Sequence, residues 1–338
     1  MAENINKQKD IQVIDDPVEA VRTLPDVYIG ALGNHGYLNM VREIAQNSFD
    51  EIIKGNTLDK NIIVSYDARS HICIVEDNGQ GIKLDMLVPV FSILHSSSNY
   101  NKVEGSGDYS SGKNGMGATI TNYLSKFFTV ESYRMDGTAA KVEFEEGKLN
   151  SKGLKSIKCP PGKHGLITTF APSDMMGQIT VTDAEIENLL WLICHLCKPG
   201  TRVIFNAINQ LGQKRKSIIE NKSGILELID GICERKVFEP GYFVEDNGTM
   251  KVEVLFTYDI MNMDDPKILG FANMCPTTGG THIDGFLDAM VKYFRDYMNK
   301  IYLANNKKLT VNAQDVRTGL RAVVSVFHLY PLFTGQSK

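Results

Sequence analysis

The sequence of 338 residues lacks a hydrophobic run long enough to cross a membrane. A membrane-spanning helix needs about 18 or more predominantly apolar residues in a row. The first ten residues, MAENINKQKD, are polar and lack the apolar segment of a signal peptide. We therefore expect a cytoplasmic protein without a membrane partner.

Cysteine is also scarce, with six residues scattered along the chain. Only Cys194 and Cys197 form a CxxC pair, and no second pair follows that would complete a zinc site. The pair stands inside the apolar run WLICHLC, which is typical of a helix in a protein core. We interpret both residues as buried thiols in a reducing compartment.

An excess of one charge is missing as well. The chain has 36 basic and 40 acidic residues, which gives a net charge of −4. This balance excludes a general attraction to nucleic acid, so contact with DNA would need a local basic surface. The length suffices for two domains, and the 43% content of hydrophobic residues is ordinary for globular domains.

Residues 38–54, LNMVREIAQNSFDEIIK, have the periodicity of an amphipathic helix. Its apolar side consists of Leu38, Val41, Ile44, Ala45, Phe49 and Ile52. Glu43, Asn47, Asp50 and Glu51 form one polar ridge. Such a ridge is typical of a solvated helix face. A carboxylate one turn from a carboxamide also suits a base beside a metal ligand.

The segment Asp77-Asn78-Gly79-Gln80-Gly81 directly follows the second of two predicted strands, 61–67 and 71–76. An acid with two close glycines lets the backbone approach a ligand and leaves one carboxylate facing it. The alternative is a plain turn, since Asp-Asn-Gly favours turns. Residues 245–248 repeat EDNG without the second glycine, and there we predict only a hairpin within 237–260.

Residues 92–117 form a long segment rich in Ser, Gly and Asn, which is typical of a functional lid or of disorder. It ends in Gly112, Gly115 and Gly117 before a predicted helix, where exposed amide N–H groups favour an anion. Gly107–Lys113 fits the P-loop pattern GxxxxGK, but Asn114 replaces the required Ser or Thr and no strand precedes it. We therefore reject a P-loop.

The remaining segments predict a mixed α+β protein. We expect a turn and a short extended piece at 26–33, a strand within 165–173, a helix at 183–197 and a strand at 201–208. After about residue 232 the character changes, and a Gly-Gly turn precedes a long helix at 285–306.

The order of these motifs resembles the GHKL ATPases, the superfamily of gyrase, heat-shock chaperones, histidine kinases and MutL. The motifs are Glu43-xxx-Asn47-xx-Asp50, DNGQG, the lid ending in GKNGMG, and GLITTF. The later motifs GGTHIDGF, DVRTGLRAVVSV and LFTGQSK resemble the transducer domain of type IIA DNA topoisomerases. The resemblance covers residues 21–338, and the lid is more similar to eukaryotic and viral enzymes, which suggests a phage or otherwise divergent source.

The resemblance implies a GHKL (Bergerat) α/β sandwich followed by a transducer of ribosomal-protein-S5-like fold. It implies an N-terminal dimerisation arm at 1–20, an ATP-binding domain at 21–232 with its lid at about 92–117, and a transducer at 233–338. The stop within the last motif leads us to expect a truncated transducer.

The resemblance also implies roles for individual residues. Glu43 would be the general base and Asn47 the ligand of Mg²⁺, while Asp77 would bind adenine with help from Thr169. Gln336 and Lys338 match a Gln-Thr-Lys loop whose lysine reaches the γ-phosphate. The further expected contacts with ATP are Asp50, Gly79, Gly81, Ile82, Ser97, Ser98, Asn99, Gly112, Lys113, Asn114, Gly115, Met116 and Gly117. The family commonly has Asp where Gln46 stands, and gyrase-like lids carry His where Asn114 stands.

The implied function is that of the ATPase gate of a DNA topoisomerase. ATP with Mg²⁺ would induce a homodimer that clamps double-stranded DNA, while DNA cleavage would belong to core domains or a subunit outside this chain. A eukaryotic source would place the protein in the nucleus. The alternatives are a nucleotide-dependent dimerisation module or decoy with little turnover, and a MutL-like or chaperone-like ATPase, against which the transducer motifs argue.

Overall fold

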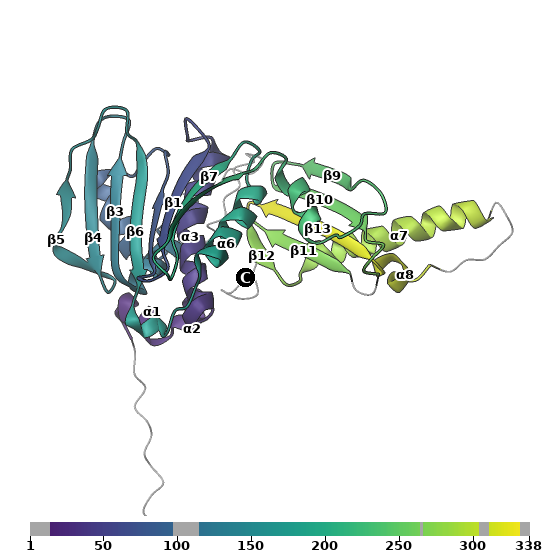
Figure 1. Ribbon diagram of the computed structural model, residues 1–338, viewed down its shortest axis with the longest axis horizontal. Helices are drawn as coiled ribbons and strands as arrows, with labels where there is room; N and C mark the ends of the chain where they lie inside the picture. The colour runs from purple at the N-terminus through teal and green to yellow at the C-terminus, as the bar shows by residue number, and fades with distance from the viewer. Residues whose placement is uncertain (1–13, 97–114, 264–265, 304–310, 332–338) are drawn as a thin grey trace, which may run out of the picture.

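The computed structural model describes residues 14–96, 115–263, 266–303 and 311–331. These residues form two α/β units, each built on its own sheet (Figure 1). We call them the N-terminal unit, with eight strands, and the C-terminal unit, with five strands. No helix within the described ranges is long and apolar enough to span a membrane.

The sheet of the N-terminal unit has the strand order β5-β4-β3-β6-β2-β1-β7-β8. The strands β1 and β7 pair in parallel, and all the other neighbours pair antiparallel. The bounds are β1 Asn61–Asp67, β2 Ile72–Glu76, β3 Ser125–Tyr133, β4 Ala139–Glu145, β5 Lys148–Ser156, β6 Gly165–Pro172, β7 Arg202–Ile208 and β8 Lys214–Glu220. Alternate residues of β1 and β2 are buried, as expected for a sheet covered on one face.

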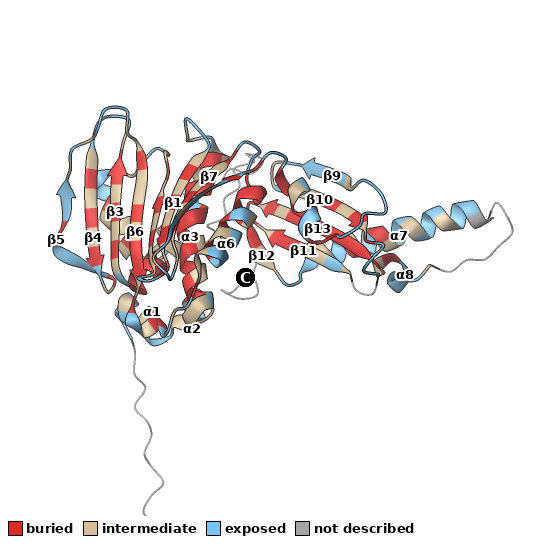
Figure 2. Ribbon diagram, viewed as in Figure 1, coloured by how far each residue is buried: buried red, intermediate tan, exposed pale blue. Residues whose placement is uncertain are grey.

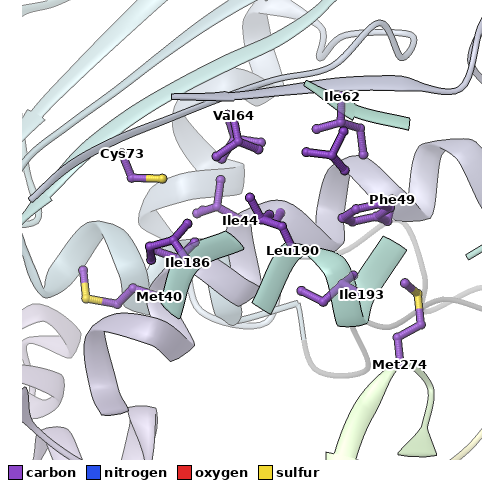
Figure 3. Close-up of a cluster of buried hydrophobic side chains, with 14 of the residues drawn as sticks. Met40, Ile44, Phe49, Ile62, Val64, Cys73, Ile186, Leu190, Ile193 and Met274 are labelled. Atoms are coloured by element: carbon purple, nitrogen blue, oxygen red, sulfur yellow. The ribbon is translucent and has the colours of Figure 1, made fainter. Parts of the chain in front are cut away.

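Helices cover the buried face of this sheet. They are α1 Pro17–Thr23, α2 Pro25–Ile29, α3 Gly33–Lys54, α4 Leu84–Ser92, α5 Gly117–Tyr123 and α6 Asp183–Leu196, with short 3-10 turns η2 Asp174–Met176, η3 Gly224–Glu227 and η4 Ile229–Gly231. Figure 3 shows side chains of α3 and α6 meeting those of β1 in the core, among them Ile44, Leu190 and Val64. The apolar side predicted for residues 38–54 is therefore the side that packs on the sheet.

The sheet of the C-terminal unit has the order β12-β11-β13-β10-β9, with β11 and β13 parallel. Its elements are β9 Gly241–Asp246, β10 Met250–Tyr258, β11 Lys267–Ala272, β12 Cys275–Thr277, α7 Thr281–Leu303, α8 Ala313–Arg317 and β13 Leu320–His328. The start of α7 packs on the sheet through Leu287 and Met290, and its exposed end projects from the molecule (Figures 1 and 2).

The two units share buried side chains. Leu255, Phe271, Met274 and Val323 from the C-terminal unit belong to the same continuous hydrophobic cluster as the core of the N-terminal unit. The burial pattern in Figure 2 accordingly continues across the junction. Since this contact is apolar and buried, a movement of one unit is transmitted to the other by packing.

Several predicted elements are confirmed. The strands at 61–67 and 201–208, the helix at 183–197 and the hairpin within 237–260 correspond to β1, β7, α6 and β9–β10. Cys194 and Cys197 are buried free thiols.

The prediction for residues 26–33 is wrong, because most of this segment is helical. Pro25 occupies the first turn of α2, and Gly30 ends the helix with a φ of 86°. Proline at the start and a left-handed glycine at the end are ordinary helix boundaries. They enclose only five residues here, too few to show a helical period.

Candidate nucleotide-binding site

A cavity of about 550 Å³ lies between α3, the turn that follows β2, α4 and the start of α5. The polar ridge of α3 forms one wall, since Glu43, Asn47, Asp50 and Glu51 all line it. Apolar residues on the other walls include Ile44, Ile82, Met86, Val90, Phe91, Met116 and Ile120. A largely apolar cavity with a few converging polar groups is the usual form of a small-molecule site.

Glu43 reaches from α3 to the first turn of α5. A Cβ atom added to Gly117 would overlap with the Glu43 carboxylate, so the carboxylate lies directly against this glycine. Both residues line the cavity, as do Gly115 and Met116. The structure therefore places an acid next to the backbone at which the Gly-rich segment ends.

Substituting Gly117 by alanine tests this close approach. The added methyl group would displace the end of a flexible side chain rather than backbone, so the fold should persist. Alanine should even favour the helix by about 1 kcal/mol. We expect ATP hydrolysis to fall by about a hundredfold, the size of effect known for a misplaced catalytic group, with no loss of thermal stability.

Gly285→Ala is the matched control for this substitution, because Gly285 also lies in a helix and has open space where its Cβ would stand. Equal loss of activity in both variants, or unfolding of Gly117→Ala, would contradict the proposed placement of the carboxylate.

Asp77 lies at another wall of the cavity and is only 8% exposed. Its Oδ1 accepts hydrogen bonds from the amides of Gly79 at 2.9 Å and Leu166 at 3.2 Å. Its Oδ2 accepts one from the Ser48 hydroxyl at 2.9 Å. Burial raises the pKa of Asp77, although these hydrogen bonds oppose the shift. The carboxylate is thus fixed in position with acceptor capacity remaining on Oδ2.

Two glycines allow the backbone to fold tightly around Asp77. Gly81 has a φ of +68° and Gly165 a φ of +106°, and a Cβ atom on either would overlap with a backbone carbonyl. Beside Gly81, Ile82 donates its N–H to Ser132 Oγ, which donates in turn to the Ile82 carbonyl. The predicted need for glycine after the acid is therefore explained at Gly81 by geometry.

Many of the site residues expected from the sequence meet in this cavity. Those that line it are Glu43, Asn47, Asp50, Asp77, Gly81, Ile82, Gly115, Met116 and Gly117. Gly79 stands just behind the wall, since its Cβ would touch Glu51 and Asp77. Others lie outside the described residues: Ser97, Ser98, Asn99, Gly112, Lys113, Asn114, Gln336 and Lys338.

Thr169 requires a correction, because Thr168 lines the cavity instead. Thr168 is buried and Thr169 is only partly buried, as follows from the alternation of side chains along β6. The sequence TT allowed either register. Sequence reasoning also missed Ser48, Arg134 and Leu166, which line the cavity too. Ser48 follows Asn47 directly, so only the neighbouring β2 turn could show that it faces Asp77.

A metal ion would need the nucleotide to complete its coordination. In the described part of the chain, no group of three or more His, Cys, Asp or Glu side chains could hold a metal. Magnesium prefers oxygen ligands and commonly takes only one or two from protein, with phosphates and water supplying the rest. The carboxamide of Asn47, which lines the cavity, fits such a partial ligand set.

A second hollow, of about 600 Å³, lies over β1, β2, β7 and β8. Its lining includes Asp67, whose carboxylate already pairs with Arg69, and Arg215, which pairs with Asp183 and Glu187. It therefore lacks the paired acid and carboxamide that distinguish the cavity beside α3.

Comparisons with known proteins agree with this geometry. A family model described as histidine kinase-, DNA gyrase B- and HSP90-like ATPase matches residues 39–174, and one described as DNA gyrase B matches residues 208–338. The chain is 30% identical to the B subunit of DNA topoisomerase 4 from Staphylococcus aureus (strain Mu50), over 99% of this chain and 51% of that protein. It is 29% identical to the B subunit of DNA gyrase from Thermus thermophilus, over 95% and 51%.

Solved structures with the same fold include the 43K ATPase domain of Thermus thermophilus gyrase B. It superposes with a TM-score of 0.70 at 28% identity, over 92% of this chain and 81% of that one. The ATPase region of Saccharomyces cerevisiae topoisomerase II gives a TM-score of 0.72 over 97% and 88%. At 21% identity, this second likeness concerns the fold alone.

Fold and site together define a GHKL-type nucleotide-binding domain followed by a transducer domain. More particularly, the chain belongs to the type IIA DNA topoisomerase family and corresponds to the ATPase region of gyrase B and of the B subunit of topoisomerase IV. The chain spans about half the length of the curated relatives that it matches.

Proposed function

We propose that this chain binds and hydrolyses ATP with Mg²⁺ and acts as the nucleotide-operated gate of a type IIA topoisomerase. The observation that carries the proposal is the shared cavity, which is lined by Glu43, Asn47 and Asp77. An acid against a glycine-rich backbone, a neutral metal ligand and a buried base acceptor are the parts that phosphoryl transfer from ATP needs.

Each residue would have one task. Asp77 accepts a hydrogen bond from the adenine amino group, and Thr168 takes the assisting place that the sequence assigns to Thr169. Asn47 binds the metal that neutralises phosphate charge, while the backbone of Gly115, Met116 and Gly117 approaches the phosphates. Glu43 orients the attacking water and receives its proton. Gln336 and Lys338 would contact the γ-phosphate from the transducer.

The gate itself would be a homodimer. We propose the domain limits 1–20 for the arm, 21–232 for the ATP-binding domain and 233–338 for the transducer. Binding of ATP would bring two chains together around double-stranded DNA, and hydrolysis would release it. Cleavage of DNA would belong to other domains or subunits of the complete enzyme.

The test is the rate of ATP hydrolysis per protomer as a function of protein concentration, combined with sedimentation in AMPPNP and Mg²⁺. We expect the rate to rise with concentration and the analogue to produce dimers, because the gate assembles two chains. A rate that does not depend on concentration would argue against the gate. Binding without measurable turnover at any concentration would instead indicate a dimerisation module or decoy.

A further inference from the structure

The β11–β12 hairpin of the C-terminal unit reaches the ATP-binding unit. Ala272 pairs with Cys275, which leaves Asn273 and Met274 as a two-residue loop. Their φ angles of 47° and 64° are those of a type I′ turn. Asparagine suits such a position, but a left-handed methionine is unusual and costs conformational energy. Its environment must therefore stabilise this conformation.

That environment is the core of the N-terminal unit. The Met274 side chain is fully buried in the cluster that includes Phe49 of α3 and Ile193 of α6. Figure 3 shows it projecting from the hairpin toward these two residues. Burial of such a side chain contributes about 1.5–3 kcal/mol, enough to offset the cost of the backbone conformation.

Gln46 of α3 makes the polar contact at the same junction. It is 2% exposed, and its Nε2 donates to the Met274 carbonyl at 3.2 Å and lies 3.7 Å from Cys275 Sγ. On α3 it stands one turn after Glu43 and directly before Asn47. The side chain therefore joins the hairpin to the helix that carries both groups.

The hairpin is equally well fixed to the rest of its own unit. Asn273 Nδ2 donates to the His328 carbonyl at 3.0 Å, and its Oδ1 accepts from the His328 amide at 2.8 Å. The Asn273 amide donates to the Val326 carbonyl at 2.8 Å. These bonds attach the turn to the end of β13, the strand that precedes residues 336–338 in the sequence.

We infer that Gln46 is a positioning residue through which the transducer sets the place of Glu43 and Asn47. The inference rests on the proposed function but assigns a contact separate from the nucleotide itself. An amide is needed here because the Met274 carbonyl is an acceptor, and the aspartate expected from the family resemblance could not donate to it. Movement of β13 would reach α3 through Asn273, Met274 and Gln46.

The first experiment replaces Gln46 by methionine, which keeps length and volume but removes both polar contacts. Since a displacement of about 1 Å can cost about a hundredfold in rate, we expect kcat to fall by between about tenfold and a hundredfold. The KM for ATP should stay within about twofold, because no nucleotide contact is lost. Gln178→Met, at an exposed glutamine, is the matched control.

The second experiment needs no turnover. Hydrogen exchange is measured on the wild type and Gln46→Met with and without AMPPNP and Mg²⁺. In the wild type, the analogue should slow exchange both around Asp77 and in the β11–β12 hairpin. In the variant, the response around Asp77 should remain and the response of the hairpin should disappear.

Three results would overturn the inference. The hairpin of Gln46→Met could still respond to the analogue, or kcat and KM could both stay at wild-type values. Alternatively, binding and thermal stability could fall together with kcat, which would show a merely structural role. A wild type that binds no nucleotide would overturn the proposed function, and this inference with it.

Discussion

Replacing Glu43 by alanine is expected to abolish ATP hydrolysis while ATP still binds. The Glu43 carboxylate lies against Gly117 in the cavity, away from Asp77, which is proposed to hold the base. Removing a positioned general base typically lowers a rate by about 10²–10⁴-fold. Binding should persist, since the carboxylate carries negative charge next to phosphates and contributes little attraction to them.

Glu43→Gln makes the same test with unchanged volume, because a carboxamide cannot accept the proton of water. Single-turnover hydrolysis and binding of AMPPNP are measured for both variants. Glu220→Ala, at an exposed position on β8, controls for loss of one negative charge. If either Glu43 variant hydrolyses ATP at the wild-type rate, then another group activates the water.

The ridge that carries Glu43 could be recognised from the sequence because its information is local. Within one helix, spacing alone decides which side chains share a side. The prediction placed Glu43, Asn47, Asp50 and Glu51 together, and all of them line the cavity. The turn after β2 was similarly local, since a strand, an acid and two glycines are adjacent in the chain.

Contacts between distant segments could not be found in this way. Gln46 and Met274 are separated by 228 positions, and nothing in the motif GFANMCP indicates that its methionine enters the core of another unit. The choice between Thr168 and Thr169 depended on the register of β6, which is set by its pairing with β2 and β3. A one-residue shift in a strand exchanges the two faces.

The resemblance to known ATPases supplied roles, whereas the structure supplied the reasons for residue types. Glycine is required at position 117 because a carboxylate lies there, and at position 81 because a carbonyl does. At position 46, the departure from the expected aspartate corresponds to a carbonyl that needs a donor. Departures from a family pattern therefore become interpretable once their partners are known.

Replacing Asp77 by asparagine is expected to weaken ATP binding by about 10- to 150-fold, or about 1.5–3 kcal/mol. The asparagine oxygen can keep the two amide donors, Gly79 and Leu166, on the Oδ1 side. Its NH₂ group then takes the place of Oδ2, where Ser48 can accept from it. The fold should therefore survive, but a donor would face the adenine amino group, which is also a donor.

The chain contains its own control for this substitution. Asp246 Oδ1 accepts from the Gly248 amide at 2.8 Å, just as Asp77 Oδ1 accepts from Gly79 at 2.9 Å. Asp246 is exposed and stands outside the cavity, so Asp246→Asn should bind ATP like the wild type. Guanine carries an acceptor where adenine carries its amino group, so Asp77→Asn should also raise the affinity for GTP relative to ATP. Calorimetric titration with both nucleotides measures this ratio. An unchanged ratio together with unchanged ATP affinity would mean that the base lies elsewhere, because a buried carboxylate cannot exchange its acceptor for a donor without a bound amino group responding.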